Sequence, residues 1–332
     1  MQIQFRLLYR SITFICFLLL LCVHWLGYTQ NYPEDWSLGE AKVVPVFVSF
    51  SHLYHDINRD STVFDQEKVV FGARIKFNEY WSGNIWVDFL QDPGESPYFK
   101  PAHVTYKNSK FKIDVGLFFL SQWRVQQQYW QNRYVHKSFQ SYYDLGYSAD
   151  LGLRGTYFIN EKLKADVAVV NGKKYKKPGL TLPLKYGATA YISPMEETLV
   201  KVYYDFYNEK IRQQTFSIFF TYGNNGTYSF SAEYNYKDGL DFSDISAHGL
   251  SGYSNVHITD NMGLFLRFDQ IWYDGFVVEE SDLPRDNNHL ILSGLQYQLF
   301  DNLRVAAAYK RINYISYLGS NMIQLSVEYR TP

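Results

Sequence analysis

The chain has almost no cysteine, and its only two, Cys16 and Cys22, lie near the start of a sequence of 332 residues. The remaining sequence cannot contain a disulfide, so the protein is not one of the small cross-linked secreted domains. An excess of charge of one sign is also missing, because 32 lysines and arginines balance 33 acidic residues. This balance excludes a nucleic-acid binder that relies on bulk positive charge and a disordered acidic chain.

Long apolar runs are nearly absent as well. The mean hydropathy of −0.28 excludes a membrane protein with several helical spans. The one long apolar run covers residues 12–23, after Arg6 and Arg10. A basic segment followed by about a dozen apolar residues is typical of a secretory signal peptide. We therefore predict a signal peptide over residues 1–30 and a single domain over residues 31–332. A membrane anchor is the alternative, but the run is short for a membrane-spanning helix.

Aromatic residues are abundant, at 19% of the chain with 30 Tyr, 25 Phe and 7 Trp. They occur mainly in segments where apolar and polar residues alternate, as at the C-terminus. There Ile323, Leu325, Val327 and Tyr329 share one face, and Gln324, Ser326, Glu328 and Arg330 share the other. Such a period of two indicates β-strands, and no segment after residue 40 shows a sustained helical period. The sequence predicts an all-β fold.

We predict sixteen strands. They cover residues 42–54, 67–77, 82–90, 102–107, 111–118, 147–158, 163–170, 184–192, 198–207, 213–223, 227–238, 246–258, 262–274, 288–299, 303–313 and 320–330.

The connections alternate between short turns rich in Asn, Asp and Gly and connections that are mostly longer. The second set covers residues 55–66, 91–101, 119–146, 171–183, 208–212, 239–245, 275–287 and 314–319. An even number of antiparallel strands with this alternation is typical of a transmembrane β-barrel of the bacterial outer membrane, with periplasmic turns and extracellular loops. A soluble β-sandwich is the alternative, because its strands alternate too. The amount of strand and the one-sided lengthening of the loops favour the barrel.

Motifs for catalysis or metal binding are lacking. The eight histidines are scattered, and the segment 249–252 does not complete a nucleophile elbow because Tyr253 stands where the last glycine should be. We predict that the protein is not an enzyme and has no cofactor and no metal site.

In a barrel whose apolar face contacts lipid, the opposite face lines the interior. The basic residues of that face are Arg74, Lys76, Lys112, Arg154, Lys164, Lys185, Lys201, Lys237, Arg267, Arg304, Lys310 and Arg330, and its acidic residues are Asp88, Asp114, Asp150, Asp166, Asp205, Glu233, Asp269 and Glu328. The predicted lining therefore has an excess of about four positive charges, which favours a mild anion preference. The alternative is that these charges pair across neighbouring strands.

The longest connection, 119–146, differs from the others. It carries Arg124, Arg133, His136 and Lys137 against the single acid Asp144, and many Trp and Tyr residues. Loops of this length in a compact domain usually have a function. We predict that it folds into the barrel, where the four basic residues form a constriction. The alternative is a cap on the outer rim.

The segment 115–172 resembles the porin superfamily. It contains Val115-Gly116, the run 128–134 (Gln-Tyr-Trp-Gln-Asn-Arg-Tyr), Lys137-Ser138, Asp150-Leu-Gly152 and Asn171-Gly172, and the phosphate-selective porin group is nearest. The resemblance implies a sixteen-stranded, trimeric, passive diffusion channel. No ladder of lysines is present, so phosphate specificity is not implied, and the chain lacks the C-terminal Phe common in such barrels.

Two functions follow from these observations, and a barrel enzyme is a third hypothesis, for which no nucleophile–base pair is evident. The first is a diffusion channel in the outer-membrane lipid for small hydrophilic solutes or ions, including anions, formed by a homotrimer and without a nucleic-acid partner. The second is a plugged barrel whose aromatic loop 119–146 binds a sugar or a protein.

Overall fold

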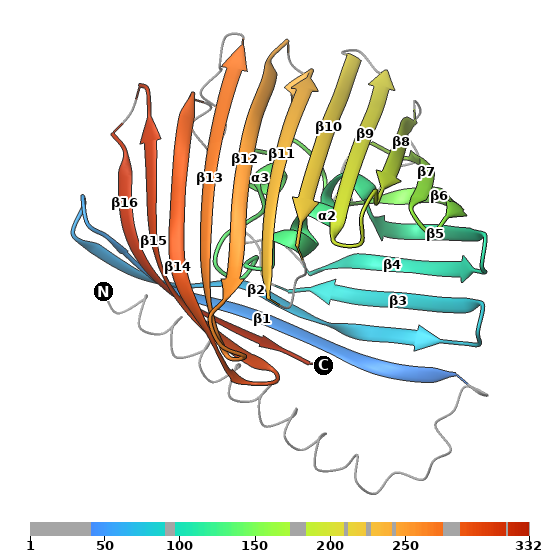
Figure 1. Cartoon of the computed structure of the whole chain (residues 1–332), viewed down its shortest axis with the longest axis horizontal. Helices are drawn as coiled ribbons and strands as arrows, with labels where there is room; N and C mark the ends of the chain where they lie inside the picture. The colour runs from blue at the N-terminus through green and yellow to red at the C-terminus, as the bar shows by residue number, and fades with distance from the viewer. Residues whose placement is uncertain are drawn as a thin grey trace, which may run out of the picture. The chain divides into compact units, whose positions relative to one another are not determined.

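The computed structural model describes residues 41–89, 97–172, 184–208, 212–223, 227–240, 244–274, 286–316 and 318–331. These residues form a closed barrel of sixteen antiparallel strands, in which each strand pairs with its neighbours in the sequence (Figure 1). The predicted fold class and strand number are therefore confirmed. The predicted signal peptide lies outside the described residues.

The first eight strands are β1 (Lys42–Asp56), β2 (Ser61–Lys76), β3 (Trp81–Asp88), β4 (Tyr98–Lys107), β5 (Phe111–Phe119), β6 (Ala149–Asn160), β7 (Leu163–Val170) and β8 (Lys185–Ile192). The last eight are β9 (Thr198–Asn208), β10 (Arg212–Tyr222), β11 (Tyr228–Asp238), β12 (Ser246–His257), β13 (Met262–Asp274), β14 (Asn288–Phe300), β15 (Leu303–Tyr314) and β16 (Ser320–Arg330).

The barrel closes where β1 pairs with β16, in a register that runs from Val48 opposite Arg330 to Asp56 opposite Met322. The backbone N–H of Thr331 donates to the carbonyl of Phe47 at 3.0 Å, next to this seam. Closure matters because an open edge strand would leave unpaired N–H and C=O groups, which hydrocarbon cannot satisfy.

The predicted loop 55–66 is wrong. The structure has a tight turn over residues 57–60, and both flanking strands extend into the predicted loop. The turn is possible because Asp60 adopts a positive φ of 47°, which Asp tolerates better than most residues, and because the N–H of Asn58 donates to the Asp56 carboxylate at 2.9 Å. β4 also begins earlier than expected, at Tyr98 instead of residue 102.

The two faces of the strands differ as the alternation predicts. On β16, Leu325 is 50% exposed on the outside, whereas Ser326 is 1% exposed on the inside. Outward-facing apolar residues on other strands are similarly exposed, among them Val115, Leu153, Val167 and Leu266. The outside of the barrel is therefore an apolar surface.

Two helices interrupt the strand pattern, α2 (Ser121–Trp130) and α3 (Phe139–Tyr142), and both lie inside the ring of strands (Figure 1). The sequence did not predict them, because the buried face of α2 consists mainly of polar residues. Gln122, Gln126 and Trp130 recur every four residues, which places them on one face of the helix. Among the described residues, no helix is long and apolar enough to span a membrane.

Candidate functional site in the barrel interior

The long connection between β5 and β6, residues 120–148, folds into the barrel and will be called the inner loop. Its first anchor is Lys201 on β9, which is fully buried. The Lys201 ammonium group donates to the carbonyls of Ser121 and Gln122 at 2.9 and 2.7 Å and to Oε1 of Gln126 at 2.6 Å. The start of α2 is thus held to the wall by a buried cation.

The second anchor is apolar. Trp130, Tyr134 and Val135 of the inner loop belong to one buried cluster with wall residues that include Phe265 and Leu290. The inner loop therefore packs on the inward-facing apolar residues of β10 and β12–β15, and we call this surface the apolar seat. Burying such rings away from water is a large favourable contribution to packing.

Two arginines on the wall, the buried Arg267 and the partly buried Arg304, complete this seat. The Arg267 guanidinium lies 5.0 Å from the Trp130 ring centroid and donates to the Lys137 carbonyl at 2.7 Å. The Arg304 guanidinium lies 4.2 Å from the ring centroid of Tyr134 and donates to the Gln131 carbonyl at 3.1 Å. Cations stacked on rings in this way add to the packing energy.

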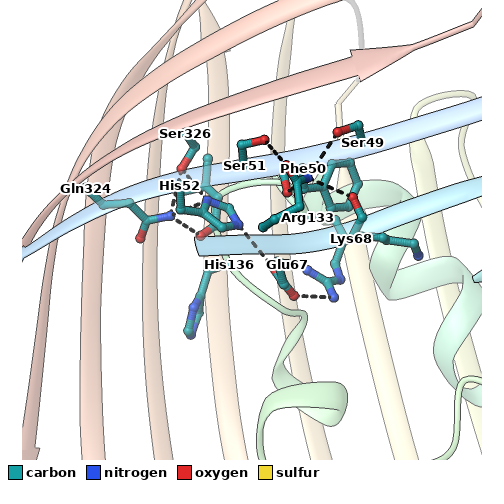
Figure 2. A network of polar contacts seen from close by, with 12 residues as sticks. Ser49, Phe50, Ser51, His52, Glu67, Lys68, Arg133, His136, Gln324 and Ser326 are labelled. Atoms are coloured by element: carbon teal, nitrogen blue, oxygen red, sulfur yellow. Dashed lines mark hydrogen bonds and ion pairs between the residues drawn. The ribbon is translucent and has the colours of Figure 1, made fainter. Parts of the chain in front are cut away.

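The third anchor ties the inner loop to the seam of the barrel (Figure 2). Nη2 of Arg133 lies 2.7 Å from Oε1 of Glu67 on β2, and the other Glu67 oxygen lies 3.1 Å from Nε2 of His52 on β1. Nδ1 of His52 is 3.1 Å from the Ser326 hydroxyl on β16. Gln324, also on β16, donates to the Val135 carbonyl at 2.7 Å. These contacts connect β1, β2 and β16 to the same stretch of the inner loop, and we call them the seam network.

Farther along, the short helix α3 is held by β11 and β14. The Gln140 amide donates to the Asn235 side-chain oxygen at 2.6 Å, and the Tyr143 hydroxyl donates to the Asn288 side-chain oxygen at 2.9 Å. Together the three anchors and α3 fasten the inner loop to most of the barrel circumference.

The predicted pore-lining residues fall into two groups according to burial. Those on β9–β16 lie against the inner loop and are buried: Lys201, Glu233, Arg267, Asp269, Lys310 and Glu328, with Arg304 partly buried. Those on β2–β6 are more varied. Arg74 and Lys76 are exposed, Lys112 is half-buried, and Asp114, Asp150 and Arg154 are buried. The water-accessible part of the interior is therefore on the side of the first strands.

That side is basic. Asp114 is a neutralising acid there, with the Lys112 ammonium at 2.9 Å from Oδ2 and the Arg154 guanidinium bound to the same oxygen. Arg124 of α2 is exposed, and the charges of Arg154, Asp114 and Arg74 act on it. Two cations therefore share one carboxylate, while Arg74 and Arg124 add further positive charge.

A cavity of about 980 Å³ lies between α2 and the short turns that include residues 108–109, 160–162 and 193–197. Its wall includes Lys107, Phe158, Lys164 and Tyr191 at strand ends. Val125, Gln128 and Tyr129 of α2 also line it. We call this space the turn-side cavity.

The four predicted constriction residues lie at different places. Arg124 is exposed on α2, Arg133 pairs with Glu67, and Lys137 is exposed. His136 is buried, with its ring centroid 4.5 Å from that of Tyr142. Burial, together with the nearby Lys310 and Arg267, lowers the pKa of His136 well below its ordinary value, so this imidazole is neutral at pH 7. A role of these residues as a constriction stays a prediction.

Several residues of the site were missed at the level of sequence. Glu67 and His52 complete the seam network, and Gln126 and Gln140 anchor the inner loop. Only the spacing of Gln122, Gln126 and Trp130 could have indicated the helix α2. It does so only if glutamine is allowed on the buried face of a helix. No group of three or more His, Cys, Asp or Glu suited to a metal ion occurs among the described residues.

No protein-family model and no curated protein matches the sequence. Solved structures do share its fold. OmpF of Salmonella typhi, in complex with daunomycin, is 13% identical with a TM-score of 0.68, covering 87% of this chain and 98% of its own. The outer membrane channel DcaP of Acinetobacter baumannii is 12% identical with a TM-score of 0.65, covering 89% and 99%. An anion-selective porin from Comamonas acidovorans is 9% identical with a TM-score of 0.64, covering 88% and 100%. The barrel thus has the fold of outer-membrane porins.

Proposed function

We propose that the protein is a porin-type channel of the bacterial outer membrane, through which small hydrophilic solutes or ions diffuse passively, with a mild preference for anions. One observation carries the proposal. The inner loop covers the interior face of β9–β16 but leaves Arg74 and Lys76 exposed, and Arg124 is also exposed on α2. A passage on this side would be lined mainly by cations. Walls of low dielectric focus such a potential and raise the local anion concentration.

The membrane location has its own support. The apolar outer surface, with residues such as Leu325 and Val167 exposed, suits contact with hydrocarbon, and closure of the barrel removes unpaired edges. The predicted signal peptide would direct export. The fold is shared with outer-membrane proteins, one of which, OmpT of Vibrio cholerae, has been solved in a trimer form. We propose a homotrimer on this analogy, and no phosphate specificity.

The test is the reversal potential of the purified protein in a planar bilayer across a salt gradient. Arg124→Glu should shift the reversal potential toward cations, most strongly at low salt, where screening is weak. Arg59→Glu is the control, because it makes the same charge change in the exposed turn 57–60. An unchanged reversal potential in the Arg124 variant, with the wild type conducting, would contradict the proposed anion path.

A plugged barrel that binds a sugar or a protein is the second candidate. The anchoring of the inner loop to strands around most of the barrel favours it. The same bilayer experiment separates the two functions, because a folded and inserted wild-type protein that never conducts would support the plugged barrel.

A further inference from the structure

We propose that the turn-side cavity binds an organic anion with a flat apolar body, such as an aromatic carboxylate. This inference deepens the proposed channel function, since it names a class of solute that would be retained near the passage. It rests on the cavity, its cations, its rings and the position of its acids, which are considered in turn.

Three lysines line the cavity: Lys162 is in a turn, and Lys107 and Lys164 lie at strand ends next to aromatic rings. The ammonium of Lys164 lies 4.6 Å from the ring centroid of Tyr191, and that of Lys107 lies 5.8 Å from the ring centroid of Phe158. Both side chains are exposed, and within the described residues neither has a carboxylate within ion-pair distance. Asp166, an acid that acts on Lys164, already accepts hydrogen bonds from the hydroxyls of Ser121 and Tyr191 at 2.8 and 2.9 Å. The two ammonium groups are thus available to a ligand.

The remaining wall is mixed, and its apolar part is formed by aliphatic and aromatic side chains. Phe158 and Leu199 line the cavity from the barrel, and Val125 and Tyr129 line it from α2, next to the exposed amide of Gln128. A wholly inorganic anion gains nothing from such surfaces, whereas an aromatic ring gains by leaving water and packing on other rings. Ligand sites commonly combine an apolar lining with a few polar groups that fix the orientation, and they have volumes of roughly 300–1,000 Å³.

The acids of the cavity lie at its rim. Glu161 and Glu196 are exposed in the turns, and Glu197 accepts a hydrogen bond from the Tyr228 hydroxyl at 2.8 Å. Lys107 and Lys164 are therefore on the strands, whereas the three carboxylates and Lys162 are in the turns. An anionic group would be drawn inward past the rim, with the apolar body against Phe158 and Tyr129.

The experiment is isothermal titration calorimetry of the full-length mature barrel in detergent with 2-naphthoate. Neutral 2-naphthalenemethanol serves as the matched ligand that has the ring but no charge, and it also reports partition into micelles. Acetate is the matched ligand that has the charge but no ring. We expect saturable binding of naphthoate only, weakened about tenfold by Lys164→Gln and by Lys107→Gln, as expected when a charged partner is lost. Lys110→Gln, in the adjacent turn but outside the cavity wall, should bind like the wild type.

Equal binding of naphthoate and naphthalenemethanol, displacement of naphthoate by equimolar acetate, or full affinity in both lysine variants would each overturn the proposal. Its failure is distinguishable from that of the channel. A protein that conducts with anion preference but does not bind naphthoate loses only the site. A protein that binds naphthoate through Lys107 and Lys164 but never conducts keeps the site and loses the channel.

Discussion

At the scale of single residues, facing the interior is not the same as facing water. Ser326 has the inward parity that alternation predicts, yet it is 1% exposed and is bonded to His52 and Gln324. An arginine at this position would have to displace the inner loop, so the water-facing character that parity alone implies for Ser326 does not hold. On the wall that carries the exposed Arg74 and Lys76, an inward-facing side chain does contact water.

Adjacent residues of β4 test this distinction. Val104 is 42% exposed on the outside, and His103 points inward and is half-buried near Asn84. We expect Val104→Arg to lower the free energy of unfolding by about 2–4 kcal/mol if it lies near the centre of the hydrocarbon layer, and His103→Arg to cost clearly less. Urea unfolding of the two variants in lipid vesicles measures the difference. Equal costs would argue that the outer surface is not in contact with lipid.

At the scale of elements, the inner loop is the part that departs from a plain strand pattern. Its helix α2 has no acidic residue in the first turn and no side-chain cap at its start. The stability of α2 must therefore come from the wall, through Lys201, the apolar seat and the seam network. A short helix is marginal on its own in water, so such tertiary contacts decide whether it forms.

The ion pair between Arg133 and Glu67 offers a direct test of this dependence. Both side chains are mostly buried, at 19% and 17% exposed, so a double-mutant cycle with Arg133→Gln and Glu67→Gln should give a coupling of about 1–3 kcal/mol, allowing for partial solvent screening. Arg133→Gln should also speed hydrogen exchange over residues 131–137.

A matched control for this cycle is the pair of Arg59 and Asp56, whose atoms are 3.9 Å apart and whose arginine is 72% exposed. Its coupling should be at most about 1 kcal/mol, as is usual for surface pairs. If the two cycles gave the same coupling, the seam network would not be holding the inner loop.

At the scale of the whole molecule, an even number of strands places the start of β1 and the end of β16 at the same end of the barrel, where Thr331 meets Phe47. The turn 57–60 and the turn 301–302 then lie at opposite ends of the barrel. The absence of cysteine after residue 22 makes this orientation easy to test.

Arg59→Cys should react with an impermeant thiol reagent on intact cells, because we expect the turn 57–60 to be extracellular. Asp301→Cys, exposed in the turn 301–302, should react only after the outer membrane is permeabilised. If only position 301 were labelled on intact cells, the barrel would have the opposite orientation. The turn-side cavity would then open to the outside of the cell.

The sequence by itself determined the barrel. Alternating side chains and turn residues such as those around Asn108 and Asn302 act locally, and hydrocarbon permits a sheet only when it is closed, so local pattern and solvent together dictate sixteen strands. The tertiary structure alone decided how the interior is used. Gln126 and Gln140 are buried, and Glu67 is mostly buried, only because partners far away in the sequence, Lys201, Asn235 and Arg133, satisfy their hydrogen bonds and charge. A buried polar group has no signature in a pattern of apolar residues, since its burial depends on a partner that only the closed barrel brings within reach.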